Sequence, residues 1–212
     1  MTAVRYPMRS ALVLALSGLS LVPVAAAAQV VVNGGVTLGF ALGNENGKRS
    51  DFNPHVEAEF GSIYGGVEAH VYNGSANTEI APYLGYRSVL GALSYDLSYR
   101  HSFLPNAGGE CCGRLGAALA LPLGNRVMTT LDMGLDPESG DTEVMLGADV
   151  TAFDRVTLSG GYGVSGAENN WELAAGYALS DTTEVVGHYY DGSAIKPYVG
   201  LDLTWRFNLM GN

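Results

Sequence analysis

Residues 198–207 read Tyr-Val-Gly-Leu-Asp-Leu-Thr-Trp-Arg-Phe, and this stretch decides the fold. Val199, Leu201, Leu203, Trp205 and Phe207 occupy every second position, and small or polar residues fill most of the positions between them. A β-strand places alternate side chains on opposite faces, whereas helical spacing would mix the two sets. The stretch therefore predicts a strand with one apolar face and one polar face.

The same two-residue period recurs along the chain and predicts about twelve strands. The other candidate strands lie near residues 36–43, 54–60, 63–72, 78–87, 91–101, 114–121, 126–133, 143–150, 156–162, 171–177 and 184–190. Short connections such as 61–62 and 153–155 alternate with mostly longer or more polar ones such as 43–53 and 102–110. With an even strand count, both termini and all the short turns lie on one side, which is the layout of outer-membrane barrels.

The fold class that this pattern predicts is all-β, a transmembrane antiparallel up-and-down β-barrel. Nearly every candidate strand carries acids on one face and apolar side chains on the other. The apolar face also carries aromatic residues near both strand ends, for example Trp205 at the turn end and Trp171 at the loop end. Two such girdles are typical of barrels at membrane interfaces. A soluble β-sandwich also alternates, and it is the structural alternative.

The N-terminal segment has the features of a secretory signal peptide. A short lead with two arginines precedes an apolar stretch from Ser10 to Val24, and a run of alanines ends at Ala28. We predict cleavage after Ala28, so that residues 1–28 form the signal peptide and residues 29–212 form the barrel. A retained membrane anchor is the alternative, although the apolar run is short for a helix that spans a bilayer.

The chain is strongly acidic. Its formal net charge is −10 at pH 7, and cleavage of the signal peptide would make it more negative by removing two arginines. Binding to nucleic acid depends on Lys and Arg meeting phosphates, so we expect no nucleic-acid partner. A hydrophobic share of 47 % suits a soluble protein as well as a barrel, because a barrel alternates its apolar residues with polar ones.

Two adjacent cysteines, Cys111 and Cys112, fall in a predicted loop. Adjacent strand residues point to opposite faces, so a disulfide between the two would be strained. A strained vicinal disulfide and an intermolecular pair both stay open, and the redox state is not determined by the sequence. Neither a nearby His nor a second cysteine pair completes a metal site, so we expect no metal and no cofactor.

One local stretch resembles a known family. Residues 79–86 read Glu-Ile-Ala-Pro-Tyr-Leu-Gly-Tyr, residues 91–96 read Gly-Ala-Leu-Ser-Tyr-Asp, and Tyr99 and Leu104-Pro105 follow. This stretch resembles the TorF-like porin family of small Gram-negative outer-membrane β-barrels. The resemblance implies an outer-membrane porin-like protein and carries no catalytic residues with it.

The last predicted strand also resembles the C-terminal signal that the barrel-assembly machinery reads in outer-membrane proteins. Tyr198, Gly200, Leu203 and Trp205 carry this resemblance. Such proteins often end on an aromatic residue, whereas here residues 208–212 follow Phe207. The resemblance implies that this machinery is a partner during insertion and that outer-membrane lipid surrounds the barrel.

If the chain is a barrel, the polar face lines its lumen. The predicted pore-lining residues are Glu57, Glu59, Glu68, Glu79, Arg87, Asp96, Arg100, Arg114, Arg126, Asp132, Glu143, Asp149, Glu172, Glu184, Asp202 and Arg206. Twelve tilted strands give a backbone diameter of about 24 Å, which leaves room for a narrow pore once side chains are added. Buried charge needs water or ion pairs, so the lumen is either an open path or a closed plug of arginine–carboxylate pairs.

These features predict a porin-like channel in the bacterial outer membrane, through which small cationic or polar solutes diffuse. Excess carboxylate favours cations over anions. A non-conducting structural or adhesive barrel is the alternative. An outer-membrane hydrolase is less favoured, because His101 and Ser102 are adjacent and would point to opposite faces, and no Gly-x-Ser-x-Gly motif occurs. His55 and His70 lie inward near carboxylates and leave an acid–base pair conceivable, but we predict no enzyme activity. The solute and the oligomeric state stay open.

Overall fold

The computed structural model describes residues 29–44, 47–72, 78–106, 109–194 and 196–210. Residues 1–28, which carry the predicted signal peptide, lie outside the described residues, so the cleavage site stays a prediction. Over the described ranges, no helix is both long and apolar enough to cross a membrane.

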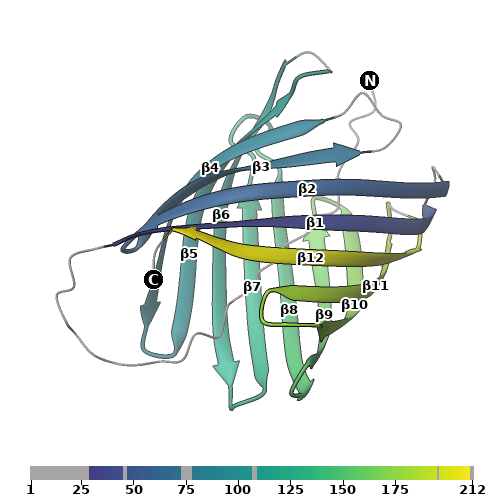
Figure 1. Cartoon of the computed structure of the whole chain (residues 1–212). Coiled ribbons are helices and arrows are strands. Elements are labelled where there is room, and N and C mark those ends of the chain that lie inside the picture. The colour runs from purple at the N-terminus through teal and green to yellow at the C-terminus, as the bar shows by residue number, and fades with distance from the viewer. Residues whose placement is uncertain (1–28, 45–46, 73–77, 107–108, 195, 211–212) are drawn as a thin grey trace.

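Twelve strands within these ranges form one closed antiparallel barrel, which confirms the predicted all-β fold. The strands are β1 (Val30–Asn44), β2 (Gly47–Phe60), β3 (Ile63–Tyr72), β4 (Glu79–Leu90), β5 (Leu93–Leu104), β6 (Gly109–Leu123), β7 (Val127–Leu135), β8 (Thr142–Phe153), β9 (Val156–Ser165), β10 (Glu168–Ala178), β11 (Thr183–Gly192) and β12 (Tyr198–Met210). Each strand pairs with its neighbours in the chain, and β1 also pairs with β12 (Figure 1).

The pairing of β1 with β12 closes the barrel. Val36 lies opposite Trp205 and Phe40 opposite Leu201, so apolar residues of both strands share one face. On its other side β1 pairs with β2 along nearly its whole length. Because the strand number is even and every pair is antiparallel, the start of β1 and the end of β12 lie on the same side as the β2–β3 and β4–β5 turns, as predicted. The prediction that all short turns lie on this side is wrong, because the two-residue β9–β10 connection, residues 166–167, lies on the opposite side.

The outer face of the barrel is apolar and exposed. Leu201 has 51 % of its surface exposed, Trp205 58 % and Phe60 56 %, and the other outward positions are similar in kind. A continuous apolar surface of this extent does not suit a monomer in water, and it matches the lipid-facing band of a transmembrane barrel. The β-sandwich alternative is excluded, because the apolar face lies outside and the sheet closes on itself.

The strands extend further than their apolar residues indicate. The predicted loops at 43–53 and 102–110 are wrong, because β1 runs to Asn44, β2 begins at Gly47, β5 runs to Leu104 and β6 begins at Gly109. Ladder pairing continues in these segments, for example between Leu38 and Phe52. Where a strand extends beyond the lipid-facing apolar band, its outward side chains need not be apolar. The apolar–polar alternation of the sequence therefore ends before the backbone hydrogen bonds between the strands do.

The same extension applies at the cysteines and at the last strand. Both cysteines belong to β6 rather than to a loop. β12 continues past Phe207 to Met210, which lies opposite Val32 across a register shift between Val32 and Asn33. The residues that follow the aromatic position therefore add to the seam instead of forming a tail.

The turns use simple local chemistry. Gly61 and Gly91 have φ angles of 62° and 64°, which favour glycine, and they form the tight β2–β3 and β4–β5 turns. In the β7–β8 connection the backbone N–H groups of Glu138 and Ser139 donate to the carboxylate of Asp136. These hydrogen bonds lower the pKa of Asp136, because they stabilise its charged form.

Candidate functional site

The inner face of the barrel carries the predicted pore-lining residues. All of them except Arg126 lie on strands, at positions that alternate with the exposed apolar residues. Arg126 lies instead in the exposed turn between β6 and β7, at the mouth of the barrel. The predicted alternation therefore extends around the whole barrel, and the candidate site is the charged lumen.

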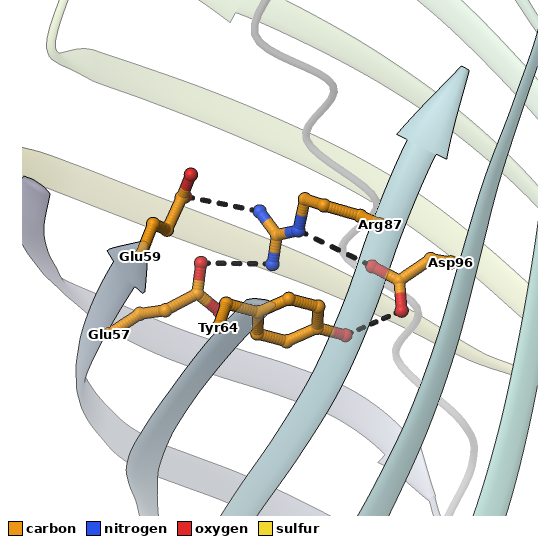
Figure 2. Close-up of polar contacts among 5 residues, drawn as sticks. All are labelled: Glu57, Glu59, Tyr64, Arg87 and Asp96. Atoms are coloured by element: carbon orange, nitrogen blue, oxygen red, sulfur yellow. Dashed lines mark hydrogen bonds and ion pairs between the residues drawn. The ribbon is translucent and has the colours of Figure 1, made fainter. Parts of the chain in front are cut away.

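Arg87 is the centre of a network at the short-turn end of β2–β5 (Figure 2). Its Nη2 donates to Glu57 Oε1 at 2.9 Å and its Nη1 donates to Glu59 Oε1 at 3.2 Å. Its Nε lies 3.5 Å from Asp96 Oδ2. The guanidinium also stacks on the Tyr64 ring, with Cζ 3.7 Å from the centroid, which is a cation–π contact. One arginine thus holds three carboxylates from β2 and β5.

Tyr64 is a site residue that the sequence reasoning missed. Its hydroxyl donates to Asp96 Oδ1 at 2.5 Å, and only 6 % of the residue is exposed. The ring lies flat over Gly85 of the neighbouring strand, where a Cβ would overlap it. Counting back by twos from Glu68 leads to Tyr64, so the alternation contained a signal for it.

Glu68 is the centre of a second group, on β3 and β5. Its Oε1 lies 2.5 Å from Arg100 Nη1 and 2.9 Å from His70 Nε2. His55 lies opposite Glu68 in the β2–β3 ladder. Glu68 therefore contacts both a permanent cation, Arg100, and a histidine, and the ion pair with Arg100 joins β3 to β5.

Further ion pairs tie together the strands on the rest of the circumference. Arg114 Nη1 lies 3.0 Å from Glu143 Oε2, and its guanidinium crosses over Gly134 of the strand between them. Arg206 Nη2 donates to Glu184 Oε2 at 2.9 Å, which joins β12 to β11. Arg87, Arg100, Arg114 and Arg206 each meet a carboxylate on another strand, as expected for a polar interior.

The remaining predicted carboxylates differ in their surroundings. Glu79 accepts a hydrogen bond of 2.5 Å from the hydroxyl of Ser102, and Asp202 Oδ2 lies 3.7 Å from Nδ1 of His188. Glu172 lies on β10, an inward position of the opposite wall. Asp132 and Asp149, on β7 and β8, form no ion pair with an arginine in the part of the chain that the structure describes.

Several other polar residues join the inner face. Asp51 and Asn53 face inward from the part of β2 that the sequence predicts as loop, and Asn53 Nδ2 donates to Asp51 Oδ2 at 2.7 Å. His101 and Ser102 diverge as expected, since Ser102 bonds to lumenal Glu79 while His101 packs on the outward Phe103. The described residues contain no group of three or more His, Cys, Asp or Glu side chains arranged to hold a metal ion.

No family model and no curated protein matches the sequence. Solved structures do match the fold. A KdgM porin structure superposes with a TM-score of 0.67 at 7 % identity, covering 82 % of this chain and 99 % of that one. A KdgM porin in complex with disordered oligogalacturonate gives 0.65 at 8 % identity, with the same coverage. A NanC porin structure gives 0.61 at 9 % identity, covering 81 % and 98 %. The chain has the fold of these outer-membrane porins, whereas membership of the TorF-like family stays a resemblance.

Proposed function

We propose that this protein is an outer-membrane channel through which small polar solutes diffuse, with a preference for cations. The observation that carries the proposal is the closed barrel whose outer face is apolar and whose inner face is charged. A charged interior needs water or ion pairs, and a lumen filled with water joins the two sides of the membrane. The likeness of fold to the KdgM and NanC porins supports this proposal.

The expected sign of selectivity follows from the inward charges. Among the predicted pore-lining residues that lie in strands, carboxylates outnumber arginines by more than two to one. Carboxylates beside a low-dielectric wall concentrate cations and repel anions. One of the matched KdgM porin structures holds oligogalacturonate, which is a polyanion. We propose that the solutes of this chain are of the opposite charge or neutral.

The proposed location and assembly follow from the same features. We propose export through the signal peptide at residues 1–28, followed by insertion into the outer membrane by the barrel-assembly machinery. The aromatic and apolar outward face of β12 supports its role in that insertion, because Trp205 and Leu203 are exposed to the surroundings.

The decisive experiment is a planar-bilayer recording of refolded residues 29–212. We expect single-channel steps, with reversal potentials in a salt gradient that show cation preference. Preference should fade as salt rises, because the screening length falls from about 10 Å at 0.1 M to about 3 Å at 1 M. Replacing Glu57, Glu59 and Glu68 by Gln should lower the preference, since Arg100 then loses Glu68 and Arg87 keeps only Asp96 of its three carboxylates.

The same recording decides between the channel and its alternative. The Arg87 network joins three strands across one part of the lumen, which is the observation that favours a plugged, structural barrel. A correctly folded barrel that gives no conductance would support the plugged barrel. A stable preference for anions would reject the proposed selectivity while leaving a channel.

A further inference from the structure

Two parts of the inner face differ in side-chain size. We call the inward residues of β2–β5 the paired wall and those of β6–β9 the small-residue wall. The paired wall includes large side chains such as Tyr64, Tyr83, Arg87 and Arg100. Small side chains occupy many inward positions of the other wall, including Gly116, Ala118, Gly134, Gly147, Ser159 and Gly161. Free cross-section therefore lies beside β6–β9.

Glycines on the two walls are covered differently. On the paired wall, the ring of Tyr83 lies over Gly66 and that of Tyr64 lies over Gly85. On the small-residue wall, a Cβ would meet the hydroxyl of Ser98 at Gly116 and the terminal methyl of Met145 at Gly161, and the Arg114 guanidinium crosses Gly134. Aromatic rings thus cover the glycines of the paired wall, whereas no aromatic ring covers these three glycines of the small-residue wall.

The small-residue wall carries two aspartates, Asp132 and Asp149, that form no ion pair with an arginine in the described ranges. Arg114 contacts Glu143 at 3.0 Å, and it is the arginine whose charge acts on Asp132. The charges of Asp149 and Glu143 act on Asp132 as well. Asp132 is 8 % exposed, and in the described part of the chain its carboxylate has no hydrogen bond and no ion pair. Arg114 is thus paired with Glu143, and among the described residues no ion pair offsets the charges of Asp132 and Asp149 on the small-residue wall.

Resting on the channel function proposed above, we infer that ions cross the lumen off its axis, beside β6–β9. Asp132 and Asp149 are then the specificity-determining residues that favour small cations. Asp132 lies on β7 towards the loop end of the barrel, and Asp149 lies on β8 towards the short-turn end. A cation that crosses the lumen therefore passes two negative charges at different heights. A recessed carboxylate attracts a hydrated cation through its field and needs no direct contact.

The test replaces each aspartate by its neutral isostere, Asp132→Asn and Asp149→Asn, singly and together. At low salt we expect the double variant to lower the cation-to-anion permeability ratio by about twofold or more, because the lost charges border the path. Glu59→Gln should lower it less, since that carboxylate sits behind Arg87. Asp181→Asn, in the exposed β10–β11 turn, removes the same charge outside the lumen and should leave the ratio unchanged.

A second measurement locates the path without relying on Asp132. In a background with Cys111→Ser and Cys112→Ser, Ser159→Cys should react with a cationic methanethiosulfonate reagent and reduce the current. Ala81→Cys, at a fully covered position of the paired wall, should not react. Fast modification at residue 81 with none at 159, or an unchanged ratio in the aspartate double variant, overturns the off-axis path. Absence of current in the unmodified protein overturns the channel function instead.

Discussion

The outer and inner faces of this barrel are made by the same strands and obey different rules. Outward positions are nearly uniform, since Leu203 on β12 lies opposite Leu38 of β1 and Val185 of β11. Inward positions are individual, since Arg87 meets three chosen carboxylates while Asp132 meets no arginine directly. Contact with lipid acyl chains requires only that a side chain be apolar. A charged side chain in the lumen requires specific hydrogen-bond or ion-pair partners.

The largest loss of stability should come from placing a charge on the outer, lipid-facing side of the barrel. Leu203→Arg places a charge among acyl chains and should destabilise the barrel by about 2–4 kcal/mol if the residue lies near the midplane. Unfolding in urea with the protein in lipid vesicles measures this cost. Asp202→Asn, one residue away on the inner face, is the matched control and should cost much less. Equal losses at both positions would mean that lipid does not distinguish the two faces.

A smaller loss of stability should come from disturbing the specific contacts of the inner face. Gly85→Ala would force the Tyr64 ring off the wall and disturb its contacts with Asp96 and Arg87, at a cost of roughly 1–3 kcal/mol. The displaced ring should also reduce the single-channel current. Gly187→Ala is the control, because no atom lies within 4 Å of the added Cβ on the outer face. A loss of stability at Gly187 comparable to that at Gly85 would remove the distinction.

The smallest effect concerns the seam. Thr37 Oγ1 and Thr204 Oγ1 lie 3.0 Å apart across β1 and β12, on the inner face. Thr204→Val should cost about 0.5–1.5 kcal/mol, which is the net worth of one hydrogen bond. In a double-mutant cycle, adding Thr37→Val should then cost little more, because the partner hydroxyl no longer has a bond to lose. Full additivity of the two losses would show that the bond adds no stability.

The sequence predicts the outer face well and the inner contacts poorly. Alternation identifies Leu201 and Leu203 as outward without knowledge of any partner, since each needs only lipid. Arg87 on β4 contacts Glu57 and Glu59 on β2 across the intervening strand β3. The strand pairing does not place these residues in line, because the residue level with Glu57 on β4 is Tyr83. Such diagonal contacts depend on strand tilt and stagger, which a single sequence does not specify.

Two further parts of the site stayed hidden for different reasons. Asp51 lies where the outward positions of β2 change from Phe52 to the polar Ser50, so the alternation ends there and the sequence does not separate strand from loop. Tyr64 is uncharged, and only charged inward residues are predicted as pore-lining, although the alternation places Tyr64 on the inner face. The ladder extends past the apolar band because paired backbone groups favour continued pairing, which composition does not record.

The β1–β12 seam also determines the order in which the chain can finish folding. Thr37 and Thr204 are 167 residues apart, and the ladder around them joins the first strand to the last. Closing so long a loop is entropically costly and comes late in folding. Until β12 arrives, the hydrogen-bonding groups along one edge of β1 are exposed and can pair with another chain. A chain truncated before Tyr198 should therefore aggregate or be degraded, even though it retains every other strand.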